Sequence, residues 1–90
     1  MEIIEEKRGP LSTFKLQGRL DSNTSVVFEK RIFDAMSDGT KNVIIDFKEL
    51  DYISSAGLRV ILKATKALKR EDGMIRLCAM QDYVKEVFEI

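Results

Sequence analysis

Residues 43–68 have the sequence VIIDFKELDYISSAGLRVILKATKAL, and they carry the strongest signal of the fold. They open on an apolar, β-branched run at 43–47, which is short enough to be a central strand covered on both faces. After a polar interval, apolar side chains recur at steps of three and four residues, the period of a helix with one buried face. These are Leu58, Ile61, Leu62, Thr65 (through its methyl group) and Leu68. The pattern predicts a strand, a loop over 50–55 that contains two serines, and a helix over 58–68.

Outward from this segment, the chain alternates between strand and helix patterns. Two strands precede it as a hairpin, closed by the turn residues Arg8-Gly9-Pro10. The further predicted elements are strands over 2–7, 14–20 and 74–79, a helix over 25–36, and a last helix with the apolar face Met80, Val84, Val87 and Phe88. The order ββαβαβα predicts a single α/β domain over residues 1–90, with a mixed, mostly parallel sheet, an N-terminal antiparallel hairpin and helices packed on it.

Two polar segments, Asp21–Thr24 and Leu50–Ser55, are predicted to be loops that follow strands at their carboxyl ends. Function concentrates at these ends in open α/β sheets, and neighbouring strands would bring Asp21 close to Ser54 and Ser55. A serine at a helix N-terminus is often a cap, because its hydroxyl accepts hydrogen bonds from free backbone N–H groups. The same position tolerates a phosphate, because the helix dipole favours negative charge there. Local chemistry leaves both roles open, cap or site of modification.

Charge and composition exclude several classes of protein. The 15 Lys and Arg residues balance the 15 Asp and Glu residues, so no net field attracts nucleic acid or an anionic membrane. The sequence has neither a signal-peptide pattern nor an apolar run long enough to span a membrane, which predicts a cytoplasmic protein. Cys78 lies in an apolar run and is expected to be a buried, reduced core residue.

An enzyme is disfavoured by the residues that the sequence lacks. It has no histidine, the usual general base for a serine nucleophile, and no glycine-rich phosphate loop. Asp21, Asp46 and Asp51 would be the acidic metal cluster of a receiver-type domain, but the chain is short for that fold and the serines would be unexplained. No catalytic residue, metal or cofactor is expected.

Two motifs resemble those of one family. Gly18-Arg19-Leu20-Asp21 followed by polar residues, and residues 51–62 with the sequence DYISSAGLRVIL, are similar to the motifs of a STAS domain, specifically of a bacterial anti-sigma factor antagonist. The resemblance covers essentially the whole chain. It implies that an anti-sigma factor, itself a serine kinase, phosphorylates a serine at the head of the second helix. The family's target serine is followed by one residue and then Gly-Leu, the position of Ser55. Ser54 stands where the sporulation-type antagonists carry an acidic residue, and it is the second candidate.

The resemblance implies a partner switch. The unphosphorylated form would bind the anti-sigma factor kinase and release the sigma factor, phosphorylation would end this binding, and a phosphoserine phosphatase would reset the switch. Asp21 is similar to the aspartate that helps to present the target serine, and it is also a candidate cap for the first helix. The residues expected to bind the partner are Asp21, Ser22, Asn23, Thr24, Ser54, Ser55, Ala56, Gly57 and Arg59.

Three further expectations complete the interpretation. The basic stripe of Arg59, Lys63, Lys66 and Arg70 is expected to be solvated, and Arg59 is placed to reach a phosphate on Ser55. The alternative function keeps the STAS fold but makes the chain a scaffold of a stressosome-like complex or a regulator of an anion transporter. Family members continue with another strand and helix after the last predicted helix, so uncovered apolar surface is expected to give a weak homodimer.

Overall fold

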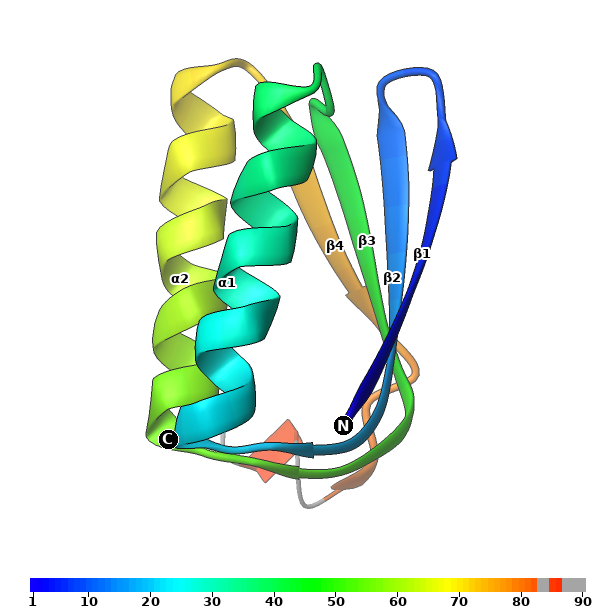
Figure 1. The fold of residues 1–90 in the computed structure, drawn as a ribbon, viewed down its shortest axis with the longest axis vertical. Coiled ribbons are helices and arrows are strands. Elements are labelled where there is room, and N and C mark those ends of the chain that lie inside the picture. Colours follow the sequence, from blue (N-terminus) through cyan, green and yellow to red (C-terminus); the bar gives the residue numbers. More distant parts are fainter. Residues whose placement is uncertain (83–84, 87–90) are drawn as a thin grey trace.

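The computed structural model describes residues 1–82 and 85–86, which form a four-stranded sheet with two long helices against it (Figure 1). The elements are β1 (Glu2–Arg8), β2 (Leu11–Leu20), α1 (Ser22–Ser37), β3 (Asn42–Ile53), α2 (Ser55–Arg70) and β4 (Met74–Cys78). β1 and β2 pair as an antiparallel hairpin, and β2, β3 and β4 are parallel neighbours in the order β1-β2-β3-β4. The predicted α/β domain with a mixed sheet and an N-terminal hairpin is confirmed.

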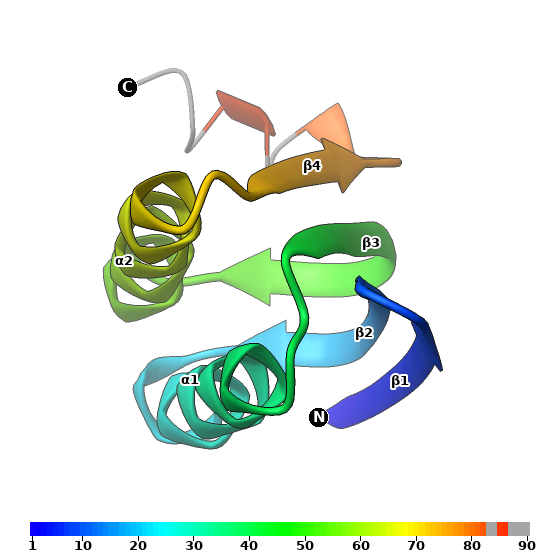
Figure 2. The same ribbon diagram turned by 90° about the horizontal axis from the view of Figure 1, so that it is seen from above.

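Both helices cover the same face of the sheet (Figure 2). α1 connects β2 to β3 and α2 connects β3 to β4, so each helix links two neighbouring parallel strands. The helices lie side by side and begin at the same end of the molecule, where β2 and β3 end (Figure 1). Within the described residues, no helix is long and apolar enough to cross a membrane.

β3 has one covered face, whereas its apolar run predicts two. Val43, Ile45 and Phe47 point toward the helices and are buried. Ile44 and Asp46 lie on the other face and are only half-buried. Because both crossovers pass on the same side of the sheet, none of the described helices lies over this second face (Figure 2).

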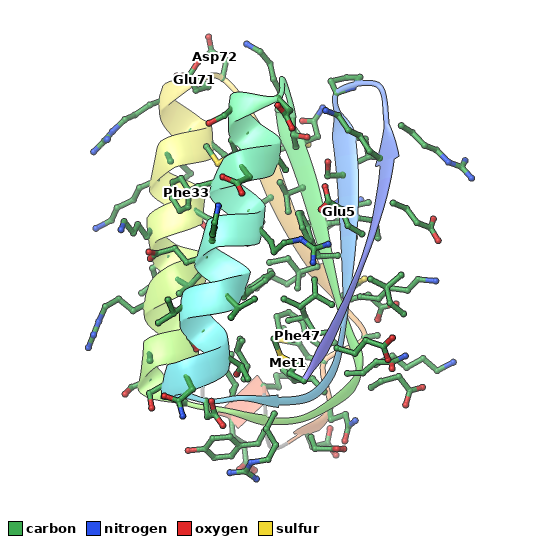
Figure 3. All side chains as sticks on the ribbon, in the orientation of Figure 1. Met1, Glu5, Phe33, Phe47, Glu71 and Asp72 are labelled. Atoms are coloured by element: carbon green, nitrogen blue, oxygen red, sulfur yellow. The ribbon has the colours of Figure 1, made fainter. Side chains whose placement is uncertain are left out.

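The core fills the layer between the sheet and the two helices (Figure 3). Its largest side chains are three fully buried phenylalanines, Phe14, Phe28 and Phe47. Phe14 of β2 meets Phe28 of α1 edge-to-face, with 6.0 Å between the ring centroids, which is a preferred geometry for aromatic pairs. This contact fixes α1 against β2.

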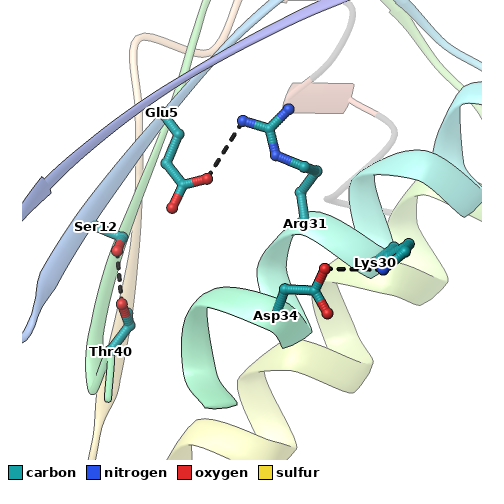
Figure 4. Close-up of polar contacts among 6 residues, drawn as sticks. All are labelled: Glu5, Ser12, Lys30, Arg31, Asp34 and Thr40. Carbon is teal, nitrogen blue, oxygen red and sulfur yellow. Dashed lines mark hydrogen bonds and ion pairs between the residues drawn. The ribbon is translucent and has the colours of Figure 1, made fainter. Parts of the chain in front are cut away.

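Polar contacts join the hairpin to α1 and to the turn after it (Figure 4). Arg31 Nη2 of α1 lies 3.3 Å from Glu5 Oε1 of β1. The hydroxyl oxygens of Ser12 and Thr40, both buried, are 2.6 Å apart. Each buried hydroxyl therefore has a partner, which removes the cost of desolvating it unpaired.

The helices begin earlier than the sequence pattern predicts. α1 begins at Ser22, where a start at about 25 was predicted. α2 begins at Ser55, one turn before the first residue of the predicted apolar stripe, so that both serines lie at its N-terminus as expected. The predicted loop over Asp21–Thr24 was wrong because Asp21 caps α1 directly, so that the next three residues form the first helical turn. Apolar periodicity does not reveal such a turn, because the residues that form it are polar and do not extend the apolar stripe.

β3 is longer than its apolar run, so the predicted loop over Leu50–Ser55 was also wrong. Tyr52 and Ile53 still pair with Arg19 and Leu20 of β2. The pairing continues through the polar interval because the register between the two strands shifts twice, and at each shift β3 advances one residue more than β2. The second shift lies between Gly18 and Arg19. Gly18 has φ +101, a conformation that favours glycine.

The buried stripe of α2 differs in part from the prediction. It consists of Gly57, Val60, Ile61, Ala64 and Leu68. Leu62, predicted to be buried, is 59% exposed. Gly57 allows the start of α2 to approach Leu20 and Ile53 closely, and the helix turns this side toward the core instead of the side that carries Leu62.

Cys78 is exposed, although it was predicted to be a core residue. Along β4, Ile75 and Leu77 pack against the core, and the alternate residues Met74 and Cys78 point to the other face. An apolar run of this length does not show which alternate residues face inward.

The last predicted helix is only partly within the described residues. Met80 packs against the core, and Lys85 donates its backbone N–H to the carbonyl oxygen of Gln81 at 2.9 Å. The remaining residues predicted for its apolar face, Val84, Val87 and Phe88, lie outside the described residues.

Candidate functional site

The residues predicted to act together gather where β2 and β3 end and both helices begin (Figure 1). Leu20 and Ile53 are register partners at the ends of the two strands. Each is followed by a helix cap, Asp21 for α1 and Ser54 for α2. The expectation that Asp21 and the serines lie at the same end of the molecule is therefore met.

Asp21 is the centre of a capping box at the start of α1. Its Oδ1 accepts hydrogen bonds from the backbone N–H groups of Asn23 and Thr24, each at 3.0 Å. In return, the Asp21 N–H donates to Thr24 Oγ1 at 2.9 Å. The Thr24 N–H is the main cause that lowers the pKa of the Asp21 carboxyl, because it stabilises the charged form. Of the two roles considered for Asp21, the geometry shows the cap.

Ser54 has a structural role, in which its hydroxyl group both donates and accepts a hydrogen bond. Its Oγ donates to the carbonyl oxygen of Leu20 at 3.0 Å and accepts from the Gly57 N–H at 3.2 Å. Its backbone N–H donates to the same Leu20 carbonyl at 2.9 Å. Ser54 thus caps α2 and joins the helix to β2, and its side chain is half-buried.

Ser55 is the first residue of α2, and its environment is different. It is exposed, and no hydrogen bond of its hydroxyl occurs among the described contacts. The positive end of the helix dipole lies at this position and favours a negative group. The two adjacent serines therefore differ: the hydroxyl of Ser54 is structural, and that of Ser55 is accessible.

Gly57 allows the start of α2 to contact the strand ends directly. A Cβ at this position would lie 2.8 Å from Leu20 Cδ2 and 3.0 Å from Ile53 Cγ1. Both neighbours belong to the buried core. The glycine in the serine motif is thus required by packing, and it indirectly sets where Ser55 lies relative to the sheet.

A shallow groove separates the first turns of α1 and α2 beside this site. Its volume is about 200 Å³, and it is lined by Ser22, Ser25, Val26, Glu29, Ala56, Arg59, Val60 and Lys63. Lys63 crosses it to Glu29, with 3.3 Å between Nζ and Oε1. Arg59 is exposed, and none of the described ion pairs involves it. Of the predicted binding residues, the groove therefore brings together Ser22, Ala56 and Arg59.

Two features of this end were not predicted. Arg19 stacks on the ring of Tyr52, with 4.2 Å between the guanidinium carbon and the ring centroid. Val26 is 69% exposed on the groove rim. The available signal for Val26 was that it and Val27 lie outside the apolar stripe of α1, where a soluble helix usually carries polar residues.

The structure does not group Asp21, Asp46 and Asp51 as a metal site. Within residues 1–82 and 85–86, no three His, Cys, Asp or Glu side chains are placed to hold an ion together. Asp46 instead accepts the Lys48 backbone N–H at 2.9 Å.

Comparison with known proteins places the chain in a family. The STAS domain model matches residues 2–90. The chain belongs to the STAS domain family. A putative anti-sigma factor antagonist of Bordetella bronchiseptica, BtrV, is 41% identical to this STAS domain over 90 residues, which are 100% of the chain and 78% of the relative. The anti-sigma-B factor antagonist of Staphylococcus aureus is 28% identical over 76 residues, 84% of this chain and 70% of the relative.

Solved structures share the fold of this STAS domain at low sequence identity. A putative anti-sigma factor antagonist from Thermotoga maritima has a TM-score of 0.90 at 18% identity, over 97% of this chain and 75% of that one. The anti-sigma factor antagonist SpoIIAA in its unphosphorylated form has a TM-score of 0.86 at 20% identity, over 98% of this chain and 82% of that one. SpoIIAA of Bacillus in its phosphorylated form has a TM-score of 0.85, also at 20% identity, over 98% and 81%.

The packing at Gly57 gives a test in which two effects have opposite signs. Helix propensity alone would make Gly57→Ala stabilising by about 1 kcal/mol. We expect the substitution to lower the free energy of unfolding by about 1–3 kcal/mol, because the methyl group overpacks the contact with Leu20 and Ile53. Urea unfolding followed by circular dichroism measures the change, and Ala56→Gly in the same turn reports propensity without this contact. A Gly57→Ala variant as stable as the wild type would contradict the packing argument.

The cap at Asp21 predicts a pH dependence of stability. Because the pKa of Asp21 is lowered in the folded state, its contribution is complete above the unfolded pKa of about 3.9. The contribution is lost as the pH falls through the lower folded pKa. Asp21→Asn keeps a capping side chain but cannot titrate, so its free energy of unfolding should fall less steeply below about pH 4. Urea unfolding at a series of pH values tests this, and parallel curves for the two proteins would refute it.

Proposed function

We propose that this STAS domain is an anti-sigma factor antagonist whose binding is switched by phosphorylation of Ser55. The unphosphorylated chain binds an anti-sigma factor that is a serine kinase, and the sigma factor is released. The observation that carries the proposal is the exposed Ser55 hydroxyl at the N-terminus of α2, beside a Ser54 hydroxyl that is used by the fold. The names of the relatives from Bordetella bronchiseptica and Staphylococcus aureus support the assignment.

Ser55 is favoured over Ser54 because a kinase needs a free hydroxyl. A phosphate on Ser54 would break the hydrogen bond to the Leu20 carbonyl and leave that oxygen with only the backbone donor. It would also force a charged group into a half-buried position, at a desolvation cost. A phosphate on Ser55 breaks no described hydrogen bond.

Phosphorylation of Ser55 changes recognition and leaves the fold intact. A phosphate adds about −1.5 to −2 charges and three acceptor oxygens, and a helix N-terminus accommodates such a group. Arg59, four residues further along α2, lies on the same helix face and can pair with it. In a complex that fits a neutral hydroxyl, the same phosphate meets steric exclusion and loses its hydration.

The energy required for such a switch is modest. Moving a partner from about 99% bound to about 1% bound takes roughly 5.5 kcal/mol of differential affinity. A buried and poorly matched phosphate can supply a penalty of this size. In this proposal the chain is a substrate and a binding partner, not a catalyst, and a phosphoserine phosphatase in the cytoplasm restores the binding form.

The site of modification is tested by peptide mass spectrometry. Incubation with the anti-sigma factor kinase and ATP should add one phosphate, on Ser55. Ser54→Ala should still be phosphorylated, although loss of the cap lowers its stability by about 0.5–2 kcal/mol, whereas Ser55→Ala should not. A phosphate on Ser54, or undiminished labelling of Ser55→Ala, would contradict the assignment.

The switch itself is tested by calorimetric titration of the kinase with two variants. Ser55→Ala should bind within about threefold of the wild type, because a small neutral side chain still fits. Ser55→Glu should bind at least about tenfold more weakly, equivalent to roughly 1.4 kcal/mol, while keeping its fold because an acidic residue suits the first turn of a helix. Equal affinities of the two variants would remove the electrostatic basis of the switch.

A further inference from the structure

The charge of the chain is unevenly distributed. The net charge is zero, but α2 carries only basic ionisable residues, namely Arg59, Lys63, Lys66, Lys69 and Arg70. Nitrogen-tipped side chains extend from this helix away from the sheet (Figure 3). A surface of one sign on a neutral protein attracts a partner of the opposite sign.

The groove beside Ser55 adds an apolar component to this basic surface. Val60 and Ala56 of α2 line it from one side and Val26 of α1 from the other. Val26 is 69% exposed, so its side chain contributes little to the core. A β-branched residue also has a weaker helix propensity than most polar alternatives, which leaves its position on the groove rim without a structural reason.

We propose that this groove receives an apolar side chain from an acidic segment of the anti-sigma factor. Val26 packs against that side chain, and the carboxylates of the segment pair with Arg59 and Lys66, neither of which has a described ion-pair partner. This inference rests on the proposed function and specifies the chemistry of the partner. Val26 becomes a binding residue that was not among the predicted ones.

The same arrangement links binding to phosphorylation. Arg59 lines the groove and lies one turn from Ser55. A phosphate on Ser55 would compete for this guanidinium from within the chain, and it would repel an acidic segment in the groove. Phosphorylation then weakens binding through charge repulsion as well as through loss of fit. The affinity for the anti-sigma factor must therefore depend on ionic strength.

A protein segment fits these features better than a membrane does. The groove is small and local, about 200 Å³, which suits one side chain. Binding to a membrane surface would require a continuous apolar band along the helix, but between Ser55 and Arg70 only Leu62 is a large apolar residue exposed to solvent.

The apolar part of the proposal is tested with two neighbouring valines. Val26→Asp puts a carboxylate into the groove, and it should weaken binding of the anti-sigma factor kinase at least about tenfold. Val27→Asp is the matched control, because Val27 is 55% exposed on the same helix and does not line the groove. Its affinity should stay within about threefold of the wild type. Circular dichroism verifies that both variants fold.

The charged part is tested with two arginines. Arg59→Glu should weaken binding at least about threefold at low salt, and the difference should shrink as ionic strength rises. Arg76→Glu makes the same change in net charge on β4, at an exposed residue of the sheet face that the described helices do not cover. It should bind like the wild type.

The outcomes separate this inference from the function on which it rests. If Ser55→Glu weakens binding but Val26→Asp and Arg59→Glu do not, the inference is overturned and the proposed function stands. If the wild type binds no anti-sigma factor kinase, both are overturned. The wild type and Val26→Asp are also sedimented with vesicles of anionic phospholipid. If the wild type sediments with the vesicles and Val26→Asp does not, the groove binds a membrane and the inference is overturned.

Discussion

The carbonyl oxygen of Leu20 holds together the end of the molecule that carries Ser54 and Ser55. It accepts two hydrogen bonds from Ser54, one from the backbone N–H at 2.9 Å and one from Oγ at 3.0 Å. These bonds hold the first turn of α2 against the end of β2, and the contact is close only because Gly57 has no side chain. The two hydrogen bonds and the packing at Gly57 together fix the position of Ser55. The first turn of α2 contains Ser55, and it cannot shift without breaking these contacts.

The sequence pattern predicted the order of elements, the hairpin and the gathering of Asp21, Ser54 and Ser55 at one end, because these depend on turn chemistry and strand order. It failed where tertiary packing decides. Leu62 was placed in the core by helical spacing and Cys78 by its apolar run, yet both are exposed. Another side of α2 faces the sheet, and strand alternation in β4 puts Cys78 on the opposite face. The start of α1 was also misplaced, because the polar first turn that the capping box of Asp21 and Thr24 forms does not appear in apolar spacing.

At the site, motif resemblance named Ser55 and geometry supplied a physical reason for preferring it. The hydroxyl of Ser54 is committed to the fold, and that of Ser55 is not. Neither source of prediction indicated Val26, because the importance of an exposed apolar residue on one helix appears only when the neighbouring helix is placed beside it. Long-range arrangement of this kind is the part of a binding surface that a single sequence does not show.

The surface at this end is composite, since Val26 belongs to α1, which precedes β3 in the chain, and Arg59 belongs to α2, which follows it. The Ser54–Leu20 hydrogen bond at the start of α2 joins residues 34 positions apart in the chain, and only the contacts of the folded state offset the entropy lost in closing a loop of that length. An unfolded copy would still contain the serine motif but would have no groove beside it. A partner that binds both helices, as proposed, therefore distinguishes a folded chain from an unfolded one, and only copies that have completed folding can take part in the proposed complex.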